Sequence, residues 1–178
     1  MFTQTKALPK VLTFLEAKYY LFSAVFVISA VFFPWFAHQF NLVGPQFLPM
    51  HFFVLIAGFL FGWRTGLLVG FLSPLMSYSI THMPPMIILP QIILELAVYG
   101  LAIGIIRERK LNIWFALPLA MIAGRLARIL FMLAFASKMN HLQFIQTSWS
   151  GILLQIALIP LIIFVIQKFI FSKNGKEV

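Results

Sequence analysis

Long apolar runs separated by short polar connectors dominate the chain. Six runs are present, at residues 19–36, 48–62, 66–80, 85–106, 112–136 and 149–171. A helix needs about 20 predominantly apolar residues to cross the roughly 30 Å hydrocarbon core of a bilayer. The pattern therefore predicts an all-α membrane protein with six transmembrane helices, forming a single integral membrane domain over residues 1–178.

The second and third runs leave an alternative open, because each has only 15 residues. Pro49 begins the second run and Pro74 interrupts the third. Short or proline-interrupted spans are tolerated where protein or a cavity covers the exposed backbone. We expect two separate spans here. The alternative joins both runs into one helical hairpin that enters and leaves the bilayer on the same side.

Composition agrees with a membrane protein and excludes several other classes. Hydrophobic residues make up 62% of the chain and charged residues 10%, with a mean hydropathy of +1.00. A soluble domain carries about a quarter charged residues. The net charge of +9 does not indicate a nucleic-acid-binding protein, because the cations lie in the connectors and not on one polar face. The absence of cysteine excludes disulfides, thiol nucleophiles and cysteine metal sites.

The positions of the cations predict the orientation in the membrane. Ten of the thirteen lysines and arginines fall on one side of the expected spans: Lys6, Lys10, Lys18, Arg64, Arg107, Arg109, Lys110, Lys168, Lys173 and Lys176. The opposite side has only Lys138. Cytoplasmic connectors are enriched in lysine and arginine, so both termini are expected in the cytoplasm. The first eighteen residues lack an apolar core with a cleavage site, so the first span is expected to be retained.

The last two cations, Arg125 and Arg128, lie inside the fifth apolar run. An arginine at mid-membrane costs about 2.5–3.5 kcal/mol and usually faces a partner, a bundle interior or a water-filled cavity. Glu95 is the only acidic residue inside another run, and it lies at a depth similar to that of Arg125. Glu95 and Arg125 form either a structural ion pair or part of a ligand site. Arg128, left without a second acid, either snorkels to the outer interface or holds an anionic group of a ligand.

Further polar and aromatic residues gather toward the outer ends of the spans, whereas the inner halves are plainly apolar. Those chosen as candidate ligand contacts are Gln91, Gln155, Asn140, His51, Tyr78 and Trp149. This asymmetry predicts a ligand pocket in the outer half, because a continuous pore would need polar residues at every depth. His51 has an alternative as an interfacial histidine, and Trp149 as a member of the aromatic belt.

Glycines recur every fourth residue in the middle of the chain. Gly58, Gly62, Gly66 and Gly70 follow this spacing, and Gly100 and Gly104 repeat it. Small residues four apart let membrane helices approach closely. They serve either packing within the bundle or docking of another membrane subunit.

An ordered set of motifs covers residues 48–104. It consists of LPMH at 48–51, LIAG at 55–58, GFLSPL at 70–75, MPP at 83–85 and ELAVYG at 95–100, together with the spaced glycines. This set and the six-span layout resemble the substrate-binding (S) component of energy-coupling factor (ECF) vitamin importers.

The resemblance implies a multi-pass protein of the prokaryotic plasma membrane that binds a vitamin or related micronutrient on its outer side. It also implies two kinds of partner, a transmembrane coupling subunit and two cytoplasmic ATPase subunits. In that family the ligand site is built by the outer halves of helices four to six and the outer connectors. Here those positions hold Gln91, Glu95, Arg125, Arg128, Asn140, Trp149 and Gln155. Family members also dock through small residues of helix one. Here Ser23, Ala24, Gly58 and Gly62 are the candidate coupling positions, although Ser23 and Ala24 lack the usual spacing of four.

We therefore expect a substrate-capture subunit with no catalytic residue, no metal site and no cofactor of its own. The chain has no GxxxxGK[ST] loop, so ATP is expected to be hydrolysed by the partner subunits. Two arginines suit a ligand with an anionic group, such as pantothenate. One alternative is an intramembrane enzyme using Glu95, His51 and His82, although HExxH, GxSxG and aspartate are absent. Another is a stand-alone secondary transporter, which usually shows symmetry between its halves.

Overall fold

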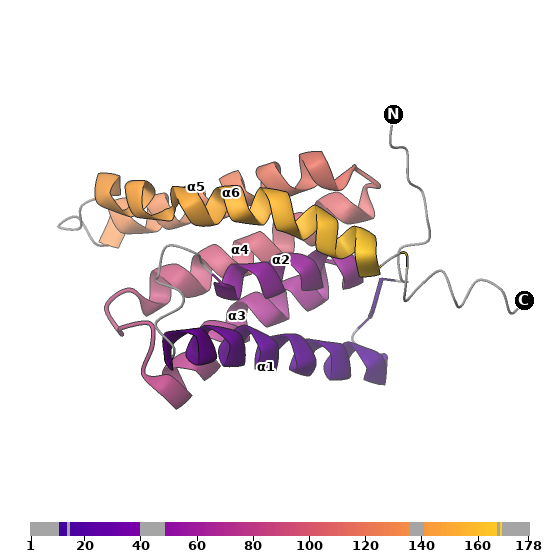
Figure 1. The fold of residues 1–178 in the computed structure, drawn as a ribbon, viewed down its shortest axis with the longest axis horizontal. Coiled ribbons are helices and arrows are strands. Elements are labelled where there is room, and N and C mark those ends of the chain that lie inside the picture. Colours follow the sequence, from indigo (N-terminus) through magenta and orange to yellow (C-terminus); the bar gives the residue numbers. More distant parts are fainter. Residues whose placement is uncertain (1–10, 14, 40–48, 136–140, 167, 169–178) are drawn as a thin grey trace, which may run out of the picture.

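The computed structural model describes residues 11–13, 15–39, 49–135, 141–166 and 168, and over 141–148 it describes the backbone alone. This part of the chain forms six helices and no strand (Figure 1). They are α1 (Ala17–Gln39), α2 (Pro49–Phe61), α3 (Trp63–Thr81), α4 (Leu89–Glu108), α5 (Ile113–Phe135) and α6 (His141–Ile166). The prediction of an all-α fold with six helices is confirmed.

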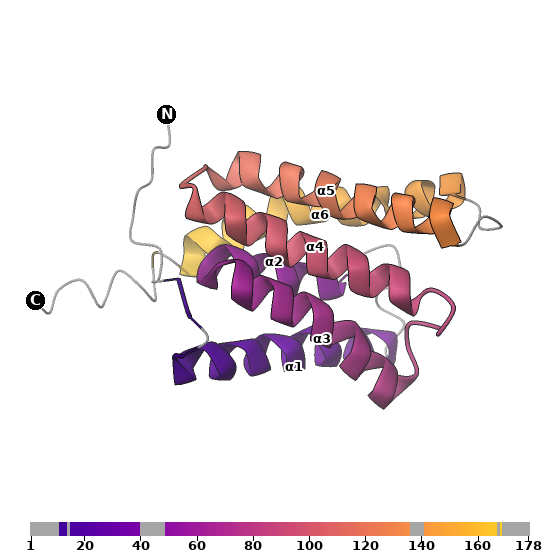
Figure 2. The same ribbon diagram turned by 180° about the vertical axis from the view of Figure 1, so that it is seen from behind.

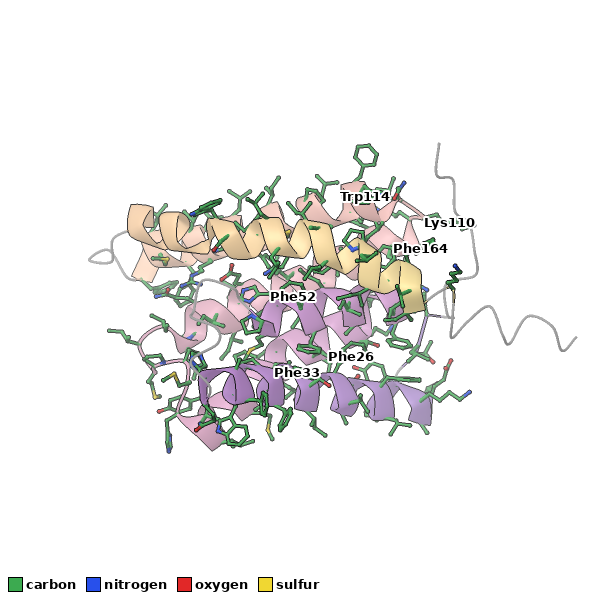
Figure 3. The ribbon with its side chains drawn as sticks, viewed as in Figure 1. Phe26, Phe33, Phe52, Lys110, Trp114 and Phe164 are labelled. Carbon is green, nitrogen blue, oxygen red and sulfur yellow. The ribbon has the colours of Figure 1, made fainter. Side chains whose placement is uncertain are left out.

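The helices run up and down, so that α1 begins and α6 ends at the same end of the bundle (Figures 1 and 2). The α2–α3 and α4–α5 turns lie at this end too, and it carries Lys110, labelled in Figure 3. We call it the basic end and the other the distal end. The basic connectors thus gather as the topology prediction requires, although which end is cytoplasmic stays a prediction.

Four helices in the described residues are long and apolar enough to cross a membrane by length and composition: α1, α4, α5 and the part of α6 from Trp149. The prediction of a multi-pass membrane protein rests on these helices. The shorter α2 has 13 residues, about 20 Å at 1.5 Å per residue. That α2 and α3 cross the bilayer separately stays a prediction, as does the extent of the single membrane domain.

Two helices begin elsewhere than the apolar runs indicate. α6 begins at His141, eight residues before the expected start at 149, because residues 141–148 are compatible with a helix but too polar to extend a hydropathy run. α4 begins at Leu89 and not at 85. Pro84 and Pro85 disfavour helical backbone in the residue before each of them, whereas Pro90 fits the first turn of a helix.

Gly62 alone separates α2 from α3. Its φ of 95° lies in a region that residues with side chains rarely adopt. A β-carbon there would also lie 2.6 Å from Val11 Cγ1 and 2.8 Å from Glu108 Oε1. The sharp turn therefore depends on glycine, and it folds α3 back along α2.

The glycines spaced by four form the contact between α3 and α4. A β-carbon on Gly66 would overlap the backbone carbonyl of Gly100, and one on Gly58 would lie 2.7 Å from the same oxygen. A β-carbon on Gly70 would overlap the carbonyl of Leu96, the residue after Glu95. This close backbone approach fixes the position of α4, and with it the polar residues on that helix.

The exterior is largely apolar and the interior holds the polar residues. Leu126 and Leu130 on α5 are 53% and 64% exposed, and Trp114 and Phe164 point away from the bundle (Figure 3). Buried positions include Gln91, Glu95, Arg128 and Gln155 beside aliphatic residues. This arrangement suits a protein surrounded by lipid.

Candidate functional site

One carboxylate, Glu95 on α4, lies at the centre of the buried polar residues. Arg128 Nη1 donates a hydrogen bond to Glu95 Oε2 at 2.7 Å. Arg125 Nε lies 3.2 Å from Glu95 Oε1, and His51 Nε2 lies 3.8 Å from the same oxygen. Side chains from α2, α4 and α5 therefore meet at one acidic group that has no exposed surface. We call these four residues the Glu95 cluster.

The local sequence explains why these side chains meet. Arg125 and Arg128 are three residues apart and share one face of α5. Gly124 lies beside the ring of Tyr99, where a β-carbon would overlap that ring and lie 2.9 Å from the backbone oxygen of Glu95. The missing side chain lets α4 and α5 approach closely. His51, near the start of α2, reaches the cluster from the distal end of the bundle.

The sequence predicted the depth of these residues correctly but not how they pair. Glu95 and Arg125 meet, as their similar depth indicated. The expectation that Arg128 lacks an acidic partner is wrong, and so is the alternative that it snorkels to the interface. Its side chain is 5% exposed and makes the shortest contact with Glu95. One carboxylate has two oxygens, and here Oε2 accepts a hydrogen bond from Arg128 while Oε1 forms an ion pair with Arg125.

The charges of the Glu95 cluster do not sum to zero. Two guanidinium groups face one carboxylate, and with His51 counted as neutral the cluster has a formal charge of +1. The chain has three other glutamates and no aspartate. Glu16 precedes α1 and Glu108 ends α4, both at the basic end, and Glu177 lies outside the described residues. A net positive charge in a largely buried place calls for an anion.

Two glutamines add neutral hydrogen-bonding groups. Gln91 lies one turn before Glu95 on α4 and is 1% exposed. Gln155 on α6 has no exposed surface, and neither polar atom of its amide has a hydrogen-bond partner among the described residues. An unsatisfied buried amide costs about 1–3 kcal/mol. Gln155 is therefore suited to bind a polar group of a ligand.

The other predicted ligand contacts lie apart from these buried groups or cannot be placed. Tyr78, near the end of α3, donates its hydroxyl to Met86 Sδ at 3.1 Å. Trp149 is 61% exposed. Asn140 lies outside the described residues. Their part in ligand binding stays a prediction.

Sequence reasoning did not assign a place in the site to Tyr99. Its buried ring packs edge-on against the His51 ring, with centroids 5.3 Å apart. The signal was present in the sequence, because Tyr99 follows Glu95 by four residues and so shares its helix face.

The four candidate coupling positions differ in exposure. Ser23, Gly58 and Gly62 are buried in contacts within this chain, whereas Ala24 on α1 is exposed. Docking through these positions stays a prediction, with Ala24 as the accessible member. No group of three or more histidine, cysteine, aspartate or glutamate residues that could hold a metal ion occurs in the residues searched, which are those described.

Comparison with known families gives one match. The model of the family described as "ECF transporter, substrate-specific component" matches residues 19–172. Comparisons with curated proteins and with solved structures give no match. The family match includes all six helices in its range except the first two residues of α1. The chain therefore belongs to the family of substrate-specific components of ECF transporters.

Proposed function

We propose that this substrate-binding subunit captures a small organic anion of the vitamin or micronutrient class, such as pantothenate, from the outer side of the membrane. Members of the family are transporter subunits that bind substrate. The proposal adds the chemistry of the ligand and the side from which it binds. It rests on the Glu95 cluster, whose two arginines outnumber its single carboxylate inside an apolar bundle.

Guanidinium groups suit this task because they stay charged and offer several donors in a plane that matches carboxylate or phosphate. Arg128 uses Nη1 for Glu95, and Arg125 lies beside the same carboxylate through Nε. Each guanidinium has five N–H donors, so it can contact Glu95 and further acceptors at the same time. Gln91 and Gln155 would hydrogen-bond neutral parts of the ligand.

Delivery into the cell is proposed to depend on partners. The family match implies association with the coupling and ATPase subunits of an ECF module. The sequence has no phosphate-binding loop, so the energy is expected to come from ATP hydrolysed by two partner ATPase subunits. The chain itself would bind, hold and release the ligand.

The test is to identify the ligand and then remove one arginine. The full chain is purified in detergent, and the small molecule that it retains is released and identified by mass spectrometry. In an equilibrium titration with that compound, Arg128→Gln is expected to weaken binding about tenfold or more, because a charged hydrogen bond is lost.

Leu126→Ala is the matched control, since Leu126 lies between the two arginines on α5 and is 53% exposed. It is expected to bind as the parent does. Unchanged affinity in a folded Arg128→Gln protein would contradict the proposal, as would a retained compound without an anionic group.

A further inference from the structure

The position of Glu95 has a consequence for which ligands the site accepts. Two arginines alone would give the site a charge of +2, and Glu95, which contacts both, reduces it to +1. His51 also faces the carboxylate, from α2. The other glutamates that the structure describes, Glu16 and Glu108, lie at the basic end, before α1 and at the end of α4. Glu95 therefore sets the charge that a ligand has to balance.

Neutrality matters here because the cluster is buried. Glu95 has no exposed surface, and the side chains of Arg128 and Arg125 are 5% and 14% exposed. An uncompensated charge in such a place is costly, because water has little access to it and apolar surroundings do not solvate it. A singly charged anion brings the occupied site to zero. A neutral ligand leaves +1, and a doubly charged anion leaves −1.

We propose that Glu95 is a specificity-determining residue, which restricts the site to ligands that bury one negative charge and discriminates against neutral and doubly charged analogues. This inference rests on the proposed function. Glu95 would act inside the empty site as a built-in anion that matches one arginine, while the ligand matches the other.

A purely structural role for Glu95 predicts a different effect of its removal on ligand affinities. If the carboxylate only held the two arginines in place, its loss would weaken binding of every ligand together. If it sets the charge, its loss changes the ratio between ligands of different charge. A second substitution that returns the charge of the site to +1 would then restore that ratio. It would do so although the double variant differs more from the parent in side-chain geometry than the single variant does.

The experiment measures affinities of the purified full chain, freed of retained ligand, for compounds sorted by charge. The neutral probes are pantothenol, nicotinamide and riboflavin. The singly charged probes are pantothenate, nicotinate, biotin and lipoate. The doubly charged probes are 4′-phosphopantetheine and quinolinate. The proteins are the parent (+1), Glu95→Gln (+2), Arg125→Gln (0) and the double variant Glu95→Gln/Arg125→Gln (+1), each checked for folding by thermal unfolding.

The parent is expected to prefer a singly charged probe over its neutral and doubly charged analogues. Glu95→Gln should raise the affinity ratio of doubly to singly charged analogues by about tenfold or more, and Arg125→Gln should raise the ratio of neutral to singly charged analogues similarly. The double variant should return both ratios to within about threefold of the parent. If Glu95→Gln does not fold, the ratio of neutral to singly charged analogues in Arg125→Gln, compared with the parent, carries the test.

The failures are distinguishable. If the parent binds a singly charged probe but the ratios do not move with the charge sum, Glu95 does not set specificity and the proposed function stands. If the parent binds only doubly charged probes, the proposal for Glu95 is likewise wrong and the proposed function stands. If the parent binds only neutral probes, or none of the panel, both proposals are overturned.

Discussion

Gln155 is a residue whose burial lowers the stability of the protein. Its amide is buried on α6 with neither polar atom hydrogen-bonded among the described residues. Folding takes those atoms from water without replacing their hydrogen bonds, at a cost of about 1–3 kcal/mol. A leucine of similar volume would avoid that cost. This is why we propose Gln155 as a ligand contact.

We expect Gln155→Leu to raise the thermal unfolding temperature of the ligand-free protein and to weaken ligand binding about tenfold. The two effects have opposite signs because the same unsatisfied amide destabilises the empty site and bonds the ligand. Thermal unfolding in detergent and an equilibrium titration measure them. Leu153→Ala, on the exposed side of α6, is the control for binding. Loss of both stability and affinity would instead indicate that Gln155 is structural.

At this scale the sequence predicted one contact of Glu95 and missed another. Depth counting placed Glu95 and Arg125 together, because helices have a fixed rise per residue. It could not assign Arg128, because a count of acids and bases does not tell which of two carboxylate oxygens faces which base. Tyr99 was missed because an aromatic residue in an apolar run resembles ordinary packing.

The α3–α4 pair dominates at the scale of helices. Its contact is made by backbone atoms of Gly66 and Gly100, which leave no room for a side chain. An added side-chain atom at this contact would force the two helix backbones apart. Since Glu95 lies on α4, the close contact between α3 and α4 at these glycines also fixes the position of the buried carboxylate.

We expect Gly66→Ala to destabilise the protein by about 1–3 kcal/mol, since overpacking at a rigid contact outweighs the better helix propensity of alanine. Ser79→Thr is the matched control, since it adds one carbon to the exposed side of the same helix and keeps the hydroxyl that bonds to the Leu75 carbonyl. Thermal unfolding in detergent compares the two. If Gly66→Ala is as stable as the control, the close approach is not needed for folding.

Hydropathy predicted that six helices exist, and glycine spacing predicted a close helix contact. Helix ends were harder. Residues 141–148 extend α6 although they are polar, because helix formation depends on backbone geometry and hydropathy reports only the lipid environment. The one-residue turn at Gly62 was also beyond a run-based prediction, since it depends on a positive φ.

At the scale of the whole molecule, apolar side chains cover the exterior, cations gather at one end and the Glu95 cluster lies toward the other. This division follows from the membrane, because charged side chains are tolerated at its surfaces but cost several kcal/mol in its interior. The orientation can be tested directly, because the chain has no cysteine. Any introduced cysteine is then the only thiol.

We expect Met83→Cys to react with a membrane-impermeant maleimide in intact cells, and Arg109→Cys to react only after the membrane is opened. Met83 follows α3 at the distal end and is 55% exposed, whereas Arg109 lies in the α4–α5 turn at the basic end. Gel-shift or fluorescence detection of the labelled protein reads out both. The reverse pattern would invert the orientation and place the binding site toward the cytoplasm.

The basic end is where four segments of the chain converge. The Leu12 amide donates to the Phe61 carbonyl at 3.1 Å, and Glu108 Oε1 accepts from the Trp63 amide at 3.4 Å, around the Gly62 turn. Leu12, Phe61 and Ile103 are buried there. This packing closes the basic end beneath the Glu95 cluster, so we expect a ligand of the cluster to enter and leave toward the distal end. If the proposed function holds, import would then need a change that brings the distal end to face the cytoplasm, because the packed basic end leaves no route through the bundle.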